Sequence, residues 1–329
     1  MDASHDDLPF AGLTPDCVFD ALHSAGYDGD GRLLPLNSYE NRVYQAWPED
    51  KPPIVVKFYR NGRWTDNAIL EEHAFIENLH AHDIPVVRPL LSNDGSTLHR
   101  YQGFRFAVFP RQGGRAPEID DLKVLTRIGA FLGRMHAVGG CGTFQHRPSL
   151  DPTTFGVASR AYLLDHSWLP AALVTVWTGV VDQALACIEA CYARAGAVKT
   201  LRLHGDCHLG NVLWTDDRPH FVDFDDARNG PAIQDLWMLL SGSPAEMQCQ
   251  LNAILEGYDS FYTFDRRELY LMEALRTLRM LHHCAWLAQR WRDPAFPPAF
   301  PWFDTPRYWE DVILELREQI ALMNEEPLR

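Results

Sequence analysis

One short stretch of the sequence decides the expected fold: Leu203-His204-Gly205-Asp206-Cys207-His208-Leu209-Gly210-Asn211-Val212-Leu213-Trp214. Apolar residues flank it, and the two glycines inside it favour a turn, so the stretch predicts a loop within a β-rich region. The loop carries an aspartate at position 206 and an asparagine five residues later. It therefore presents a carboxylate and an amide oxygen close together in the chain.

The pattern His-x-Asp-x-x-x-x-Asn has the spacing of a kinase catalytic loop. Phosphoryl transfer needs a carboxylate that orients the attacking hydroxyl and accepts its proton, and it needs oxygen ligands for Mg²⁺ beside the phosphates. Asp206 suits the first task and Asn211 suits the second. An ordinary polar loop after a strand would have the same appearance, so further motifs have to decide between the two interpretations.

A second motif, Phe221-Val222-Asp223-Phe224-Asp225-Asp226, follows at the distance expected for a kinase. It is a short apolar strand that runs into carboxylates, and Asp223 stands where kinases place a metal-binding aspartate. A carboxylate at a strand end suits Mg²⁺, a hard cation that prefers oxygen ligands. A solvated acidic turn is the alternative, but the order and spacing of the two motifs favour the magnesium site.

A metal-hydrolase interpretation of the same loop is less well supported. His204 and His208 are four residues apart, as in a zinc-binding helix. That motif requires a glutamate directly after the first histidine and a helical context, whereas Gly205 follows His204 here. We expect Cys207 to pack as a small residue in a tight loop rather than to bind a metal.

A lysine interrupts the apolar strand Ile54–Tyr59 at position 57. A buried ammonium group is costly unless it is paired. Nucleotide phosphates and a carboxylate on the following helix would both satisfy Lys57, and Glu71 and Glu72 are the candidates. A lysine on an edge strand that points to solvent is the alternative. Combined with the loop, the lysine indicates a phosphate contact.

The expected glycine-rich phosphate loop is missing from this chain. The turn before the strand at 42–47 reads Leu36-Asn37-Ser38-Tyr39-Glu40-Asn41-Arg42 and contains no glycine. Ser38 and nearby backbone amides are still able to contact phosphate, and asparagines favour a tight turn. A hairpin loop without a ligand role is the alternative.

Strand patterns dominate up to position 109, and helical patterns dominate after it. The expected strands are 42–47, 54–59 and 103–109, with an extended segment at 84–87. The expected helices are 66–82, capped by Asp66, and 119–138, 169–195 and 268–292. Residues 111–115 are expected to form a hinge. The fold class is therefore α+β, with a β-rich N-terminal lobe at 1–109 and a mainly helical C-terminal lobe at 110–329.

The composition limits the binding partners and the compartment that we expect for this chain. The formal net charge of −14 repels nucleic acid and anionic membranes, so neither is expected. Residues 1–7 show no signal-peptide pattern, and the apolar run 169–181 falls short of a membrane span because polar residues and Pro170 interrupt it. Seven scattered cysteines suit a reducing compartment. We expect a cytoplasmic monomer.

Together the motifs resemble the aminoglycoside phosphotransferase and choline kinase superfamily. The most specific stretches are Pro35–Gln45, Val55–Arg60, His204–His208, Asp225–Trp237 and Trp291–Pro297. They resemble one branch of that superfamily, the bacterial serine/threonine protein kinases of envelope stress. The resemblance runs from about Leu13 to the end and implies a bilobal protein-kinase-like fold. It also implies ATP as co-substrate, Mg²⁺ as cofactor, a protein substrate and autophosphorylation.

The resemblance also implies roles for individual residues. Asp206 would be the proton acceptor, and Asn211 and Asp223 would bind Mg²⁺, with Asp223 counted as catalytic too. The residues implied for the nucleotide are Ser38, Lys57 with Glu72 as its partner, and Phe109 through its backbone. Asp235 would brace the catalytic loop.

Two other functions stay open on this evidence. A kinase of the same fold that acts on a small molecule, such as an amino alcohol, would show the same motifs. A nucleotide-binding pseudokinase or scaffold is the other, although intact Lys57, Asp206, Asn211 and Asp223 argue against it. The basic and aromatic stripe Arg276–Trp286 and the segment Pro294–Trp302 are interpreted as core packing rather than a substrate groove.

Overall fold

The computed structural model describes residues 8–215 and 218–329, which form two compact units. Unit 1 comprises the chain up to Pro117 together with Gln145–Arg147 and Gly210–Asp225, and unit 2 comprises Glu118–Phe144, Pro148–Leu209 and Asp226–Arg329. Unit 1 thus contains all of the predicted lobe 1–109 and also the later segment Gly210–Asp225. Residues 1–7, on which the signal-peptide expectation rests, lie outside the described residues.

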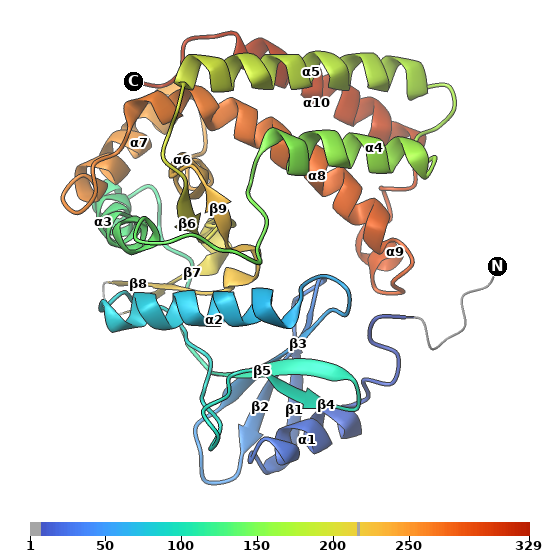
Figure 1. Ribbon diagram of the computed structural model, residues 1–329, viewed down its shortest axis with the longest axis vertical. Coiled ribbons are helices and arrows are strands. Elements are labelled where there is room, and N and C mark those ends of the chain that lie inside the picture. The colour runs from blue at the N-terminus through green and yellow to red at the C-terminus, as the bar shows by residue number, and fades with distance from the viewer. Residues whose placement is uncertain (1–7, 216–217) are drawn as a thin grey trace. The chain divides into compact units, whose positions relative to one another are not determined.

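Unit 1 is built on a five-stranded antiparallel sheet with the order β1-β2-β3-β5-β4 (Figure 1). The strands are β1 (Gly29–Leu36), β2 (Arg42–Pro48), β3 (Ile54–Tyr59), β4 (His99–Tyr101) and β5 (Phe104–Pro110). The three expected strands are present, and β1 and β4 were not predicted. Because β3 pairs with β2 on one side and β5 on the other, Lys57 lies on an inner strand, and the edge-strand interpretation is wrong.

The two faces of the sheet are covered differently, as the alternation along β3 requires. Val56 and Phe58 are fully buried on the face covered by α1 (Pro15–Ser24). Tyr59 packs on the other face with Ile69 of α2 (Asp66–Ala81). Lys57 shares this second face, since it alternates with Val56 and Phe58.

Helices α1 and α2 of unit 1 both differ from expectation. α1 was not predicted, although Thr14 accepts a hydrogen bond from the Cys17 N–H and Pro15 occupies the first helical position. At α2 the predicted cap, Asp66, is wrong: the Thr65 hydroxyl accepts from the Ala68 N–H. Asp66 instead forms an ion pair with Arg105, with Nη1 and Oδ1 3.1 Å apart. Serine, threonine and aspartate are all good caps, so sequence alone did not choose between the neighbours.

Unit 2 is mainly helical, so the expected fold class is confirmed. Its helices are α3 (Leu122–Gly139), α4 (Ala158–Asp165), α5 (Val174–Ala195), α6 (Ile233–Trp237), α7 (Pro244–Tyr258), α8 (Met272–Arg290), α9 (Phe296–Ala299) and α10 (Pro306–Met323), with a short strand pair, β6 (Leu201–Leu203) and β9 (Arg228–Gly230). The expected helices correspond to α3, α5 and α8, with later starts than predicted. α4, α7 and α10 were not predicted.

Helix α5 is longer and more continuous than the interrupted run at 169–181 suggested. By length and composition alone it is able to cross a membrane. That is weak evidence, because the core helix of a globular unit passes the same test. Here α5 packs along α10 within unit 2 and buries Trp177, Val181 and Ile188 (Figure 1).

Glycines let α3 and α7 approach each other backbone to backbone. A Cβ atom added at Gly257 of α7 would lie 1.9 Å from the carbonyl oxygen of Thr126 in α3. A Cβ atom added at Gly129 of α3 would lie 2.0 Å from the carbonyl oxygen of Ile254. Both clashes involve backbone atoms, so a side chain at either position would push the helices apart.

Gly257→Ala should therefore destabilise unit 2 by about 3 kcal/mol or more, because the helix pair has no flexible atom that is able to give way. Gly179→Ala in α5 is the matched control, since an added Cβ there meets nothing within 4 Å. That variant should be stabilised by about 0.5 to 1 kcal/mol. Urea denaturation midpoints measure both, and equal midpoints for the two variants would contradict the packing argument.

Candidate active site

A pocket of about 380 Å³ lies within unit 1, a volume typical of small-molecule sites. Its lining includes Leu36, Asn37, Ser38, Val43, Val55, Lys57, Glu72, Ile76, Val87, Phe109, Asn211, Leu213, Val222, Asp223 and Phe224. Every residue that the sequence suggested for nucleotide or metal is in this set. Apolar side chains and a few polar groups thus meet in one cavity.

A hairpin brings the two suggested metal ligands together. Strand β7 (Val212–Thr215) pairs with β8 (Arg218–Phe221), with Val212 opposite Phe221. The register therefore places Asn211 across from Val222, whose N–H donates to the Asn211 carbonyl at 3.1 Å. Asp223 follows directly and has a left-handed backbone, with φ of 59°. Residues twelve positions apart thus line the same pocket because β7 and β8 pair between them.

Lys57 lines this pocket and is buried among carboxylates. Its Nζ lies 3.0 Å from Asp223 Oδ1 and 3.1 Å from Asp225 Oδ1. Burial alone would lower the pKa of Lys57, but Asp223, Asp225 and Glu72 outweigh it and raise the pKa well above its ordinary value. The lysine therefore stays charged. The contact with Asp225 was not predicted, although that residue belongs to the motif Phe221–Asp226, called the acidic motif below.

The structure decides between the two candidate helix carboxylates. Glu72 is buried, and its Oε1 lies 4.0 Å from Lys57 Nζ, whereas Glu71 accepts the backbone N–H groups of Gln145 and His146. Burial raises the pKa of the Glu72 carboxyl, and the cations beside it oppose that rise. Glu72 is thus the helix carboxylate that faces Lys57.

Arg147 is the second cation at Glu72 and was missed by the sequence analysis. Its Nη2 lies 2.6 Å from Glu72 Oε2, and it also donates to the carbonyl oxygens of Ala68 and Asp225. Arg147 therefore ties α2 to the acidic motif. The only sequence signal was a single arginine in a loop, seventy-five residues from its partner, and such a signal does not identify a contact.

Arginines hold the turn between β1 and β2 in place of glycines. Arg60 donates from Nε to the Glu40 carbonyl at 2.9 Å and from Nη2 to the Tyr39 carbonyl at 3.1 Å. Arg63 lies 3.7 Å from Glu40 Oε2 and 2.5 Å from Asp225 Oδ2. The turn that carries Ser38 is thus linked through charged groups to the acidic motif. Guanidinium groups suit this task because their donors form a rigid planar fork.

The predicted catalytic loop of unit 2 is anchored through its backbone, as expected for Asp235. The Asp235 carboxylate accepts the N–H groups of His204 and Gly205, both at 2.8 Å. His136 contacts the same carboxylate at 3.1 Å and the Tyr258 hydroxyl at 2.8 Å. Burial opposes ionisation of Asp235, but these hydrogen bonds hold its pKa below the ordinary value. The loop is therefore fixed independently of the side chain at position 206.

Backbone conformation and burial explain the residue types at positions 204, 205 and 207. Gly205 has φ of 85°, and an added Cβ would lie 2.1 Å from the Asp226 carbonyl oxygen, so only glycine fits. His204 is fully buried, and its Nδ1 accepts from the Asp206 N–H at 3.3 Å. Cys207 is also fully buried, and burial raises the pKa of its thiol well above the ordinary value. Cys207 thus packs in the loop as predicted.

Asp206 is partly exposed and flanked by two side chains of unit 2. Arg279 Nη2 of α8 lies 2.7 Å from Asp206 Oδ1. His208 Nε2 lies 3.6 Å from Asp206 Oδ2. The interpretation of the stripe Arg276–Trp286 as core packing is therefore incomplete. Leu278 and Leu281 are buried as expected, but Arg279 faces the carboxylate of the catalytic loop.

The helix that carries Asp235 is supported by a second buried carboxyl. Glu268 is 2% exposed and accepts the N–H of Ile233 at the start of α6, at 2.9 Å. Burial raises the pKa of Glu268 to about 7. The carboxyl is therefore neutral in the folded protein over a pH range in which it is ionised in the unfolded chain.

This difference predicts a pH-dependent stability. The folded pKa lies above 4.5, the ordinary value for a glutamate, so folding retains a proton and stability falls as pH rises from about 4.5 to about 7. The loss is of the order of 3 kcal/mol. Glu268→Gln keeps an oxygen acceptor without the charge and should flatten this dependence. Urea midpoints of both proteins at pH 5 and pH 8 give the comparison, and parallel pH dependences would contradict it.

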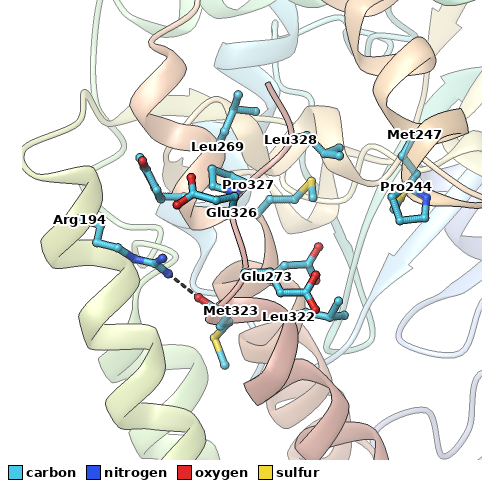
Figure 2. Close-up of a pocket in the computed structure, with 13 residues that line it drawn as sticks. Arg194, Pro244, Met247, Leu269, Glu273, Leu322, Met323, Glu326, Pro327 and Leu328 are labelled. Carbon is cyan, nitrogen blue, oxygen red and sulfur yellow. Dashed lines mark hydrogen bonds between the residues drawn. The ribbon is translucent and has the colours of Figure 1, made fainter.

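A second, smaller pocket of about 90 Å³ lies in unit 2 (Figure 2). Residues of the C-terminal segment, Glu325–Leu328, line it together with Met247 and Glu273. Arg194 donates to the Met323 carbonyl at its edge. The volume is too small for a nucleotide, and none of the residues suggested for catalysis lines it.

Comparisons with known proteins agree with the geometry. The model of the phosphotransferase enzyme family, APH, matches residues 32–271. Stress response kinase A of Escherichia coli K12 is 46% identical over 320 residues, covering 97% of this chain and 96% of that protein. The serine/threonine protein kinase RdoA of Salmonella typhimurium is 44% identical over the same shares of the two chains.

Solved structures show the same fold at low sequence identity. The amicoumacin kinase hAmiN, in complex with AMP-PNP, Ca²⁺ and Ami, aligns with a TM-score of 0.70 at 19% identity, covering 91% of this chain and 90% of that one. A microcompartment-associated aminopropanol kinase aligns with a TM-score of 0.65 at 20% identity, covering 92% and 94%. The match of the family model and the near full-length identity to the curated relatives lead to one conclusion: the chain belongs to the phosphotransferase enzyme family and, within it, to the stress response kinase A group.

Proposed function

We propose that this phosphotransferase is an ATP- and Mg²⁺-dependent serine/threonine protein kinase of the bacterial cytoplasm that acts in the response to envelope stress. The observation that carries the proposal is the shared pocket of unit 1, lined by Ser38, Lys57, Phe109, Asn211 and Asp223. To bind a nucleoside triphosphate, a protein of net charge −14 needs local positive charge or a metal ion at the site. Unit 1 supplies the charged lysine and the oxygen ligands in the same cavity.

We assign the nucleotide to unit 1. Lys57 would contact the phosphates, with Glu72 setting its position. Ser38 would contact the phosphates from the turn, and the backbone of Phe109 would meet the adenine. The apolar side chains of Val43, Leu213 and others that line the pocket suit a purine ring. The lobe at 1–109 keeps its proposed nucleotide-binding role, extended by the β7–β8 hairpin.

The donor set fits Mg²⁺. Asn211 offers an amide oxygen and Asp223 a carboxylate, and both line the pocket, as a hard divalent cation requires. When bound, the ion neutralises charge that develops on the transferred phosphoryl group. The side chain of Asp223 is 57% exposed and thus accessible from the cavity.

Asp206 is assigned as the proton acceptor of unit 2. Its carboxylate would orient the hydroxyl of the acceptor and take its proton as the new P–O bond forms. The residue stands five positions before Asn211 in the chain, so one loop supplies the acceptor carboxylate and a metal ligand. The lobe at 110–329 would then carry the catalytic loop and the substrate.

The protein substrate and the physiological role rest on the relatives. Proteins 44 to 46% identical over almost the whole chain are named stress response kinase A and serine/threonine protein kinase RdoA. The aminopropanol kinase and the amicoumacin kinase share the fold at 20% identity or less, which supports architecture alone. A protein acceptor is therefore the proposal, and a small hydroxyl compound is the rival.

Transfer of the labelled γ-phosphate from ATP with Mg²⁺ tests the proposal. Purified protein is offered a serine-rich protein acceptor and, separately, a panel of small hydroxyl compounds. Label in protein that is lost in Asp206→Ala would support a protein kinase. Label only in small molecules would overturn the protein substrate and keep the mechanism. ATP binding without transfer to any acceptor would instead support a nucleotide-binding scaffold.

A further inference from the structure

Arg279 contacts the carboxylate that we assign as proton acceptor. Its Nη2 lies 2.7 Å from Asp206 Oδ1, and both residues belong to unit 2. The nearby residues Leu278 and Leu281 of α8 are fully buried, so the packed helix fixes the Cα and Cβ atoms of Arg279. The mechanism above gives this arginine no role.

The other partner of the contact is fixed as well. The backbone at 204 and 205 donates to the buried Asp235 carboxylate, and Gln234 Nε2 donates to the Gly205 carbonyl at 3.0 Å. Two well-anchored elements, the loop and α8, therefore hold Asp206 and Arg279 together. The anchored backbones limit how far the two side chains are able to separate, although an ion pair with a 40% exposed arginine adds little stability by itself.

The guanidinium has more donors than the contact uses. An arginine carries five N–H donors in a planar fork, and the contact with Asp206 is made by Nη2. The side chain is 40% exposed, so part of the group faces solvent beside the carboxylate. A second anion is able to bind there without displacing the first.

The positive charge of the Arg279 guanidinium would favour acceptors with a negative group near the reacting hydroxyl. An acceptor hydroxyl that meets Asp206 lies within a few ångströms of the guanidinium. A cationic group next to that hydroxyl, as in an amino alcohol, would be repelled by the guanidinium of Arg279. A carboxylate next to the hydroxyl would be attracted. The net charge of −14 repels acidic acceptors at long range, so a local cation is what such an acceptor would need.

We propose that Arg279 determines acceptor specificity and that the acceptor is a serine or threonine flanked by aspartate or glutamate in a polypeptide. The inference rests on the proposed function, because it takes Asp206 as the group that receives the acceptor proton. It adds the chemical class of the substrate and disfavours a cationic small molecule.

The test measures kcat/KM with peptides that differ in charge alone. Serine peptides carry glutamate, glutamine or lysine on both sides of the serine and are otherwise identical. Two small acceptors, glycerate and ethanolamine, place a carboxylate or an ammonium group next to a hydroxyl. The enzymes are wild type, Arg279→Gln, Arg279→Lys and the control Arg307→Gln, which removes an arginine paired with Asp311 on the surface of α10.

Wild type should prefer the glutamate peptide over the lysine peptide at least tenfold. Arg279→Gln should bring the ratio to one or below, because the net charge of −14 then favours the lysine peptide. Arg279→Lys should keep part of the preference, and Arg307→Gln should leave it unchanged. An equal loss for all peptides in Arg279→Gln, with the ratio intact, would overturn the proposal, because Arg279 would then only position Asp206.

The small acceptors separate this inference from the proposed function. If no peptide is phosphorylated and a small compound is, the protein-kinase proposal fails. The inference about charge is then decided by the compound: preference for glycerate supports it, and preference for ethanolamine overturns it.

Discussion

Asp206→Ala is expected to reduce the rate of phosphoryl transfer by about a thousandfold or more while ATP binding stays within a fewfold of wild type. General-base catalysis and orientation of the nucleophile contribute effects of this size. The variant loses the carboxylate that would receive the proton of the acceptor, but the pocket proposed for the nucleotide is lined by residues of unit 1. Single-turnover transfer from labelled ATP and titration with a fluorescent ATP analogue measure the two quantities separately.

The loop itself should survive this substitution. Its anchors are the backbone N–H groups at 204 and 205, not the side chain at 206. A thermal midpoint close to that of wild type is the control that excludes unfolding as the cause of lost activity. Full activity in Asp206→Ala would show that another group accepts the proton and would contradict the mechanism proposed for Asp206.

Asp223→Asn is expected to lower transfer by a similar factor, and this loss should depend on the Mg²⁺ concentration. The change removes one negative charge from the donor set and keeps the size of the side chain. It also keeps the backbone, because asparagine tolerates the left-handed conformation that residue 223 adopts, with φ of 59°. Initial rates over a range of Mg²⁺ concentrations measure the effect, and rates equal to wild type at every concentration would contradict the assignment.

Asp223→Ala and Asp50→Ala separate charge from backbone strain. Asp50 also has a positive φ, 56°, but lies in an exposed turn away from the pocket. Both alanine variants should lose about 1 kcal/mol of stability, because alanine is strained at positive φ. Only Asp223→Ala should lose activity as well.

The parts of the site that sequence predicted are those encoded over short distances. Asp206 and Asn211 share a loop, and Asp223 lies at the other end of a hairpin whose register follows from two short strands. Lys57 was recognisable because an unpaired ammonium in an apolar strand is costly. Each of these inferences needed one local pattern and one physical rule.

The residues that sequence did not reveal depend on contacts between distant segments. Arg147 meets Glu72 across seventy-five positions, and Arg279 meets Asp206 across seventy-three. An arginine in a loop or on a helix has many possible partners, and only the folded chain selects one. The missed helices have a similar cause: α1 is ten residues long and carries a good cap, but short amphipathic patterns are common by chance.

The backbone anchoring of the predicted catalytic loop has a consequence for what one mutation would do to this chain. Asp235 and Gly205 hold the loop in shape whatever stands at position 206. An aspartate codon becomes an asparagine codon by one base change, so a single mutational step would separate this chain from one of the same shape that lacks the proposed proton acceptor. Loss of catalysis and loss of structure are therefore expected to be separable by mutation, and a chain without the proposed proton acceptor should keep the pocket of unit 1.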